Sequence, residues 1–270
     1  MTRSLLFLCS AALAWAQGGS APFSHHALQV KQYSQAENEA IVKKFHGMRV
    51  TDVMDGLDVV GLQDLMVMDP AIRPKWRDEQ KFTHRIYGAA VTLRIVPTQE
   101  RAPVFANKDD YYKWKRDWAG RLSRGGYPQY LTPDTVLVVD ASRTREMGFC
   151  GSANAYGWLQ RGMRGIVTDG GCRDSDEMIL ERIPVYERNL VRGINEGRMV
   201  IESWNAPVNV GGVTVMPGDI VVADADGVVV VPRAKAEAVA AAAREVLDGD
   251  KASRRKLYEK AGRPADFTVK

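Results

Sequence analysis

Two nearly continuous apolar runs constrain the fold of this chain more than any other feature of its sequence. They are 135–140 (TVLVVD) and 165–169 (GIVTD), and residues 152–162 between them are predicted to be helical. Continuous apolar runs are typical of strands that are covered on both faces, as in a parallel sheet. A strand, a helix and a second strand within about 35 residues form a βαβ unit. The sequence therefore predicts an α/β fold with a parallel βαβ core.

Further elements are expected on both sides of this core. The expected helices cover 35–48, 52–60, 178–182 and 234–247, and the expected strands cover 88–96, 184–186 and two hairpins at 208–215 and 220–232. Thr51 is the expected N-cap of the second helix, since its hydroxyl can accept a hydrogen bond from an unpaired backbone amide. No internal repeat or linker divides the sequence. We therefore expect a single domain over residues 35–250 and a solvated basic tail over 251–270.

An aromatic-rich insertion is expected at residues 99–133. It carries six aromatic residues among many charges, namely Tyr111, Tyr112, Trp114, Trp118, Tyr127 and Tyr130. We expect a helix and a loop whose aromatic side chains serve packing, in a lid or a subunit contact. The 37 Lys and Arg residues are spread along the chain and the net charge is only +4. Nucleic-acid-binding proteins usually concentrate basic residues in one patch, so no nucleic-acid partner is expected.

The first 16 residues, MTRSLLFLCSAALAWA, have the pattern of a secretory signal peptide. Arg3 gives a positive start, a short apolar run follows, and an Ala-Trp-Ala sequence suits a signal peptidase. The run is shorter than the ~20 residues of a transmembrane helix, and the alternative to a signal peptide is a buried N-terminal helix. Residues 17–34 are expected to be a flexible leader in which His25 and His26 are solvated. We therefore expect an exported protein, periplasmic or secreted, with no membrane attachment in its mature form.

Polar residues follow each of the two core strands. Gly151-Ser152-Ala153-Asn154 opens the helix between them, and Arg173-Asp174-Ser175-Asp176-Glu177 follows the second strand. Both segments belong at the carboxyl edge of the sheet, where ligands bind in open α/β folds. A helix N-terminus offers free amides to a carboxylate, acidic side chains suit Mg²⁺ or Mn²⁺, and Arg173 adds a cation. The competing interpretation is a solvated helix start with Asp174 as its N-cap.

These residues resemble the motif of the RraA-like family, which includes the 4-hydroxy-4-methyl-2-oxoglutarate aldolases and an RraA-type regulator of ribonuclease activity. The motif is a Gly, a fixed interval, Arg-Asp, two residues, and an Asp or Glu. Here those places hold Gly151, Arg173, Asp174 and Glu177. Three other segments are also similar to the family, namely 51–57 (TDVMDGL), 87–92 (YGAAVT) and 217–232. The resemblance covers about residues 45–245 without the insertion, and identifies the chain as a member of the family.

The resemblance implies a single swivelling β/β/α domain with C-terminal β hairpins, assembled as a trimer or hexamer with sites at subunit interfaces. It also implies a metal-dependent lyase, a class II aldolase that releases pyruvate from a small α-keto acid such as 4-hydroxy-4-methyl-2-oxoglutarate or oxaloacetate. Asp174 would then anchor Mg²⁺ or Mn²⁺, and Glu177 would hold its hydration shell. Arg173 would bind the keto oxygen and stabilise the enolate. The substrate carboxylate would be held by the amides that follow Gly151, those of Ser152, Ala153 and Asn154.

Ser152 departs from the family pattern, because the aldolases usually carry an acidic residue directly after the Gly. A serine cannot act as a carboxylate base. Either another carboxylate replaces it, from a neighbouring subunit for example, or the substrate and reaction differ, or the chain is a non-catalytic protein-binding regulator. Export argues against the regulator, since an exported protein would not meet a cytoplasmic ribonuclease complex.

Three cysteines are too few for a disulfide-built scaffold. Cys150 and Cys172 each lie directly before a motif element. We expect two buried free thiols there, with a disulfide as the alternative in an exported protein. Asp219, Asp224 and Asp226 are expected to form turns.

Overall fold

The structure, a computed structural model, describes residues 30–123, 125–141, 144 and 146–270. The predicted signal peptide, most of the predicted leader, and His25 and His26 lie outside these residues. The helices are α1 (Gln35–Phe45), α2 (Val50–Val59), α3 (Lys108–Trp118), α4 (Ser152–Leu159), α5 (Ser175–Leu180) and α6 (Ala236–Lys260). The strands are β1 (Arg73–Pro74), β2 (Ile86–Pro97), β3 (Thr135–Asp140), β4 (Gly165–Thr168), β5 (Val185–Glu187), β6 (Met199–Trp204), β7 (Val208–Val210), β8 (Val213–Val215), β9 (Ile220–Asp224) and β10 (Gly227–Val231).

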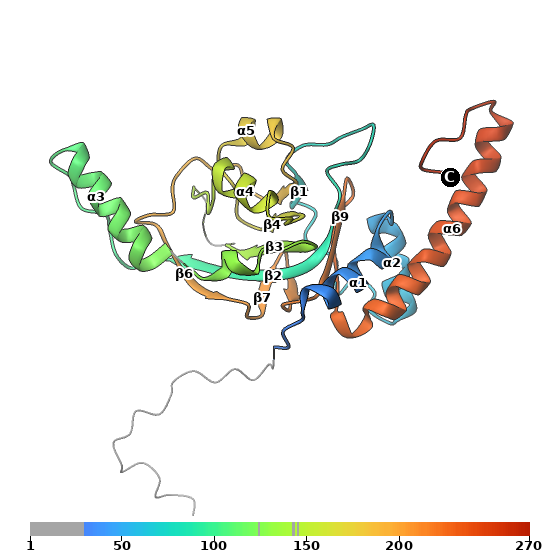
Figure 1. The fold of residues 1–270 in the computed structure, drawn as a ribbon, viewed down its shortest axis with the longest axis horizontal. Coiled ribbons are helices and arrows are strands. Elements are labelled where there is room, and N and C mark those ends of the chain that lie inside the picture. The colour runs from blue at the N-terminus through green and yellow to red at the C-terminus, as the bar shows by residue number, and fades with distance from the viewer. Residues whose placement is uncertain (1–29, 124, 142–143, 145) are drawn as a thin grey trace, which may run out of the picture.

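A mixed sheet forms the centre of the fold (Figure 1). Its order is β1-β5-β4-β3-β2-β9-β10, and β6 also pairs with β2. β2, β3, β4 and β5 are parallel neighbours, whereas β9, β10 and β6 join in antiparallel fashion. The predicted parallel βαβ core, β3-α4-β4, is therefore confirmed, and the predicted hairpins are β7-β8 and β9-β10.

The two faces of the sheet are covered by different elements, which explains why the four central residues of β3 are all apolar. Leu137 and Val139 belong to a buried cluster with residues of α4 and α5. Val136 and Val138 point the other way, into a second cluster with the β7-β8 hairpin. A third cluster packs α1, α2 and α6 against β9 and β10. Figure 1 shows α4 and α5 above the sheet, β7 below it, and α1, α2 and α6 beside it.

The beginning of α2 differs from the prediction. The helix starts at Val50, so Thr51 lies inside it and the predicted Thr51 N-cap is wrong. Arg49 precedes the helix, and its backbone amide donates to Asp52 Oδ2 at 2.7 Å. The Asp52 carboxylate thus occupies the positive N-terminus of the helix and leaves no need for a hydroxyl cap. Further along α2, a Cβ on Gly56 would lie 2.7 Å from Val239 O, so the glycine allows α2 to pack closely on α6.

The last helix is longer than predicted. α6 runs to Lys260 instead of ending near Leu247, and the predicted domain limit at residue 250 lies inside it. Residues 263–270, here named the C-terminal tail, fold back along the end of α6 (Figure 1). Arg255 Nε donates to Val269 O at 2.9 Å, and the Val269 side chain is fully buried. Most of residues 251–270 are exposed, as predicted, but residues 251–260 continue the helix and Arg255 binds the backbone of Val269.

The insertion contains α3 and extends away from the sheet (Figure 1). Its aromatic side chains contact one another, with ring centroids of Phe105 and Trp114 5.2 Å apart and those of Trp114 and Trp118 5.5 Å apart. The expected helix and the packing role of these side chains are confirmed. A lid or a subunit contact stays a prediction. Within the described ranges, no helix combines the length and apolarity needed to cross a membrane.

Candidate functional site

The structure brings the two predicted site segments side by side at the carboxyl edge of β3 and β4. Phe149 N donates to Gly171 O at 3.3 Å, and Arg173 N donates to Cys150 O at 3.1 Å. These backbone bonds continue the parallel arrangement of the two strands beyond their ends. As a result, Gly151 at the start of α4 faces Asp174 at the start of α5.

The Asp174 side chain connects the two segments. Its backbone is left-handed, with φ 63° and ψ 53°, which is uncommon for a residue other than glycine and is often found at functional sites. Asp174 occupies the N-cap position of α5 but makes no side-chain capping bond to that helix. Instead, Asp174 Oδ2 accepts a hydrogen bond from Ser152 N at 3.2 Å. The interpretation of Asp174 as a simple cap of its own helix is therefore wrong, since its carboxylate serves the N-terminus of α4.

Gly151 is required by this close approach. A Cβ at this position would lie 2.2 Å from Asp174 Oδ2, a distance that real Cβ atoms do not show. Gly151 is the N-cap residue of α4 and has no side chain to bond the first amides of the helix. Ser152 N bonds Asp174, while the amides of Ala153 and Asn154 have no acceptor among the described residues. Free amides at a helix N-terminus are suited to bind an anion such as a carboxylate.

Arg173 places a positive charge beside this carboxylate. Arg173 Nε lies 3.7 Å from Asp174 Oδ1, and about a third of each side chain is exposed, 35% and 38%. The stem of Arg173 packs on Gly148, where a Cβ would lie 2.9 Å from Arg173 Cβ. The guanidinium keeps donors free for a ligand, because the contact to Asp174 is too long for a direct hydrogen bond.

The acidic residues of this site fit a hydrated cation. Glu177 lies one turn after Asp174 on α5, and both residues are exposed. Over the residues that the structure covers, no group of three or more His, Cys, Asp or Glu side chains could enclose a metal. Mg²⁺ keeps several water ligands and is often held by one or two carboxylates. This donor set therefore fits Mg²⁺ or Mn²⁺ and does not fit a closed structural zinc site.

A buried ion pair between Lys75 and Glu187, which was not predicted from the sequence, supports the residues of this site. Lys75 Nζ lies 2.5 Å from Glu187 Oε1 and also donates to Ser175 Oγ at 2.8 Å. Glu187 Oε2 accepts from Cys172 N at 2.7 Å. Both charged side chains are almost fully buried, and burial raises the pKa of Glu187 although Lys75 opposes that shift. The pair holds the backbone on both sides of Arg173 and Asp174.

The two cysteines beside the motif are free and buried, as expected. Their Sγ atoms lie 3.7 Å apart, and burial raises the pKa of the Cys172 thiol. The turn role expected for the C-terminal aspartates also agrees with the structure. Asp219 accepts from Met216 N at 2.8 Å, and Asp224 accepts from Asp226 N at 2.9 Å.

Comparisons with known sequences give a family. The sequence model of the RraA-like family, described as aldolase/RraA, matches residues 50–230. A Halalkalibacterium halodurans protein provisionally named 4-hydroxy-4-methyl-2-oxoglutarate aldolase is 30% identical over 128 residues, 47% of this chain and 60% of that protein. A Burkholderia mallei protein with the same provisional name is 29% identical over 181 residues, 67% of this chain and 93% of that protein. Protein DlpA of Legionella pneumophila is 22% identical over 188 residues, 70% of this chain and only 27% of that relative.

Comparisons with solved structures support the fold. RraAS2 of Streptomyces coelicolor, described as an unusual member of the RNase ES inhibitor RraA protein family, superposes with a TM-score of 0.64 at 22% identity. The match covers 84% of this chain and 99% of that chain. An uncharacterized protein of Pseudomonas syringae has the same TM-score and identity, over 84% of this chain and 94% of that chain. The predicted mixed α/β fold is confirmed by these neighbours.

Proposed function

This chain belongs to the RraA-like family, and on that premise we propose that it is a divalent-metal-dependent carbon–carbon lyase. Its substrate would be a small α-keto acid such as 4-hydroxy-4-methyl-2-oxoglutarate or oxaloacetate, and its product pyruvate. The observation that carries the proposal is the hydrogen bond from Ser152 N to Asp174 Oδ2. It joins a helix N-terminus, a carboxylate and the adjacent Arg173 in one exposed site, and these are the groups that an α-keto acid needs.

The protein groups divide the work of binding. In the proposal, the free amides of Ala153 and Asn154 bind the substrate carboxylate at the positive end of α4. The Arg173 guanidinium donates hydrogen bonds to the keto oxygen. In aldol cleavage a base takes the proton of the substrate hydroxyl, the carbon–carbon bond breaks, and the hydroxyl carbon leaves as the carbonyl of a second pyruvate; oxaloacetate loses CO₂ instead. The electron pair of the broken bond remains in the enolate of pyruvate, which then takes a proton from water. Arg173 stabilises the reaction because negative charge develops on the oxygen that it binds.

Asp174 and Glu177 would hold Mg²⁺ or Mn²⁺ next to Arg173. A divalent cation supplies Lewis-acid polarisation of the keto oxygen. Asp174 keeps Oδ1 available for this role, since Oδ2 accepts from Ser152 N. The Gly151 position brings that carboxylate against α4, so the cation and the substrate carboxylate would bind within one small site.

The base for aldol cleavage is not Ser152, and we propose that a carboxylate of a second subunit supplies it. Within the proposal the protein is a trimer or hexamer with its sites at subunit interfaces. Large apolar side chains near the site are exposed in the single chain, among them Leu180 and Ile179 on α5 and Tyr156 on α4. Exposed apolar groups of this kind support an interface at this face.

The test is a pyruvate-release assay with oxaloacetate and with 4-hydroxy-4-methyl-2-oxoglutarate. We expect release that needs Mg²⁺ or Mn²⁺, stops with chelator, and is lost in Asp174→Ala. Asp176→Ala is the matched control, because this neighbouring carboxylate is exposed and forms no hydrogen bond or ion pair with the described residues. Full activity in the presence of chelator, or full activity of Asp174→Ala, would refute the mechanism.

A second candidate is a non-catalytic protein-binding regulator, which Ser152 favours because the acid expected there is missing. The assay separates the two candidates. Absence of pyruvate release from a panel of α-keto acids, by a folded protein loaded with metal, would favour the regulator.

A further inference from the structure

A cavity of ≈ 410 Å³ lies next to α6 and shares no residue with the site described above. Its walls come from the turn before α2, the loop that precedes β2, the second half of α6 and the C-terminal tail. These four segments are far apart in the sequence. The size of the cavity is within the range of small-molecule sites, about 300–1,000 Å³.

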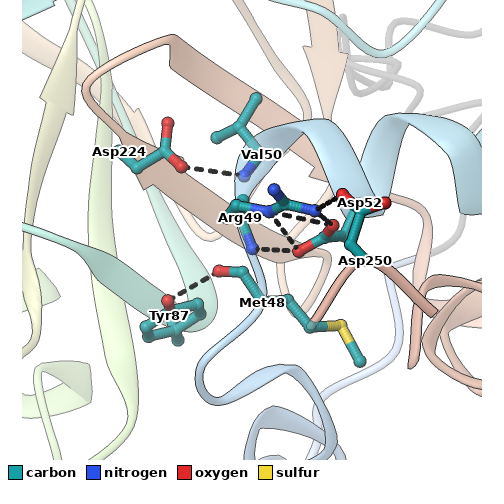
Figure 2. Close-up of polar contacts among 7 residues, drawn as sticks. All are labelled: Met48, Arg49, Val50, Asp52, Tyr87, Asp224 and Asp250. Carbon is teal, nitrogen blue, oxygen red and sulfur yellow. Dashed lines mark hydrogen bonds and ion pairs between the residues drawn. The ribbon is translucent and has the colours of Figure 1, made fainter. Parts of the chain in front are cut away.

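The cavity is lined by five cationic side chains and one carboxylate. The cations are Arg49, Lys81, Arg85, Lys251 and Arg254, and the carboxylate is Asp250. Figure 2 shows that Arg49 is held by two acids, Asp52 and Asp250. Asp250, the one carboxylate among the described lining residues, is therefore already paired. In the described part of the chain, the other four cations form no ion pair with any carboxylate.

These four cations surround one cavity and have no carboxylate partner among the described residues. Lys251 and Arg254 lie three residues apart on α6, where side chains of like charge are neighbours and repel. Both are half-buried, so water screens their charges less than at an open surface. Arg254 has only a long hydrogen bond to Thr268 Oγ1, at 3.4 Å. A bound anion would remove the repulsion and supply the missing acceptors.

The rest of the wall is aromatic. The ring centroids of Phe82 and Phe267 lie 5.2 Å apart, and the Arg85 guanidinium lies 4.5 Å from the Phe82 ring centroid. Tyr87 also lines the cavity, but its hydroxyl donates to Met48 O at 2.7 Å (Figure 2). The unsatisfied polar groups of the wall are therefore cationic, and the remaining surface suits the apolar body of a ligand.

We propose that this cavity is a binding site for a small organic polyanion, a molecule with two or more carboxylate or phosphate groups on a compact apolar body. Two observations favour a small molecule over a nucleic acid. The cations line a bounded cavity, and the chain as a whole carries a net charge of only +4. Extended nucleic acids instead need a long basic groove. The proposal does not depend on the lyase function, because no residue is shared.

The experiment is isothermal titration calorimetry of the full chain in metal-free buffer at low ionic strength. Citrate is the carboxylate probe and inorganic pyrophosphate is the phosphate probe. We expect at least one probe to bind. The double variant Lys251→Gln/Arg254→Gln should weaken that binding by about tenfold or more, because it removes two cations that would donate charged hydrogen bonds to the anion.

The matched control is Lys256→Gln/Lys260→Gln, which removes the same charge from exposed positions on the same helix, outside the cavity. It should change the affinity less than twofold. Three results would overturn the proposal: no binding of either probe, equal weakening in both double variants, or a change in the mass by light scattering that occurs only in Lys251→Gln/Arg254→Gln. The last result would mean that the cations contact a second copy of the chain. The titration contains neither metal nor lyase substrate. Its result therefore tests the polyanion site even if the lyase assay shows no activity.

Discussion

At the scale of single residues, the site depends on one missing side chain. Gly151 has an ordinary extended backbone, with φ −109° and ψ 177°, so conformation alone does not demand a glycine. The demand comes from Asp174, whose carboxylate occupies the space of the absent Cβ. This contact lets one carboxylate bond an amide of α4 while its other oxygen stays open to solvent.

We predict that Gly151→Ala folds but loses activity. The new methyl group would displace the Asp174 carboxylate, and a displacement of about 1 Å in a catalytic group costs about 100-fold in rate. The measurement is kcat/KM for pyruvate release, together with the melting temperature. Gly157→Ala on the same helix is the control, because a Cβ there has open space. It should keep full activity and gain about 0.5–1 kcal/mol of stability, since alanine favours a helix. Wild-type activity in Gly151→Ala would contradict the steric argument.

The sequence predicted these residues because they follow strands whose carboxyl ends must meet. Gly151, Arg173 and Asp174 meet at the sheet edge as expected, whereas Lys75 and Glu187 were missed. Glu187 closes a short apolar strand, and that buried charge was an available signal. Lys75 lies in a loop without periodicity, 112 positions away in the chain from Glu187. No local sequence pattern predicts the Lys75–Glu187 ion pair, because it forms only in the tertiary fold.

At the scale of elements, the end of β4 is fastened to the end of β3 by Asp169. This buried carboxylate accepts a hydrogen bond from Ala141 N at 2.9 Å through Oδ1. Burial raises the pKa of Asp169 above its ordinary value of 3.8, and the hydrogen bond to Ala141 only partly opposes the shift. Protonation of Asp169 therefore favours the folded state because it removes the cost of burying a charge, although it weakens the hydrogen bond from Ala141 N.

Stability should consequently depend on pH through Asp169. The folded-state pKa is raised, so the contribution of Asp169 is complete below about pH 3.8 and is lost as the pH rises through the folded pKa. Asp169→Asn keeps the Oδ1 acceptor and cannot ionise. We expect the free energy of unfolding of Asp169→Asn to rise above that of wild type as the pH increases from about 3.8. The rise should be ~1.4 kcal/mol for each unit between the unfolded and folded pKa of Asp169, and the difference should then stay constant.

The measurement for this variant is urea denaturation across the acidic to neutral range. Asp226→Asn is the control, since it removes a charge from an exposed turn. A stability difference between Asp169→Asn and wild type that stays constant with pH would show that Asp169 has no raised pKa.

Elements differ in how far local sequence decides them. β3 occupies 135–140 as predicted, because both of its faces are buried and its four central residues are apolar. β6 was not predicted, since its sequence MVIESW does not alternate between apolar and polar residues and its pairing with the far end of β2 is set by tertiary folding. The predicted end of α6 near Leu247 was too early, because the basic residues that follow were interpreted as a solvated tail. They continue the helix to Lys260, and Arg255 binds Val269 O.

At the scale of the whole molecule, one sheet carries three separate packing clusters. The proposed lyase site stands over the cluster that contains α4 and α5. The proposed polyanion cavity stands over the cluster that contains α2 and α6. Ligands at the two sites would therefore stabilise different parts of the fold.

Export is also a property of the whole chain, and we propose that residues 1–16 are removed. N-terminal sequencing of the mature protein should then begin near Gln17, in an extracytoplasmic fraction. The control is the same chain expressed from Gln17 with a new initiator Met, which should remain in the cytoplasm. Recovery of the full-length protein in the cytoplasm, starting at Met1, would sink this proposal.

The return of the C-terminal tail along α6 has a practical consequence. Phe267 and Thr268 line the cavity and Val269 is buried beside them, so the last residues of the chain complete its wall. A carboxypeptidase that trims only four residues would open this wall and leave the sheet intact. For the same reason a purification tag fused after Lys270 would emerge at the cavity. Recombinant protein intended for ligand screening should therefore keep residues 267–270 intact.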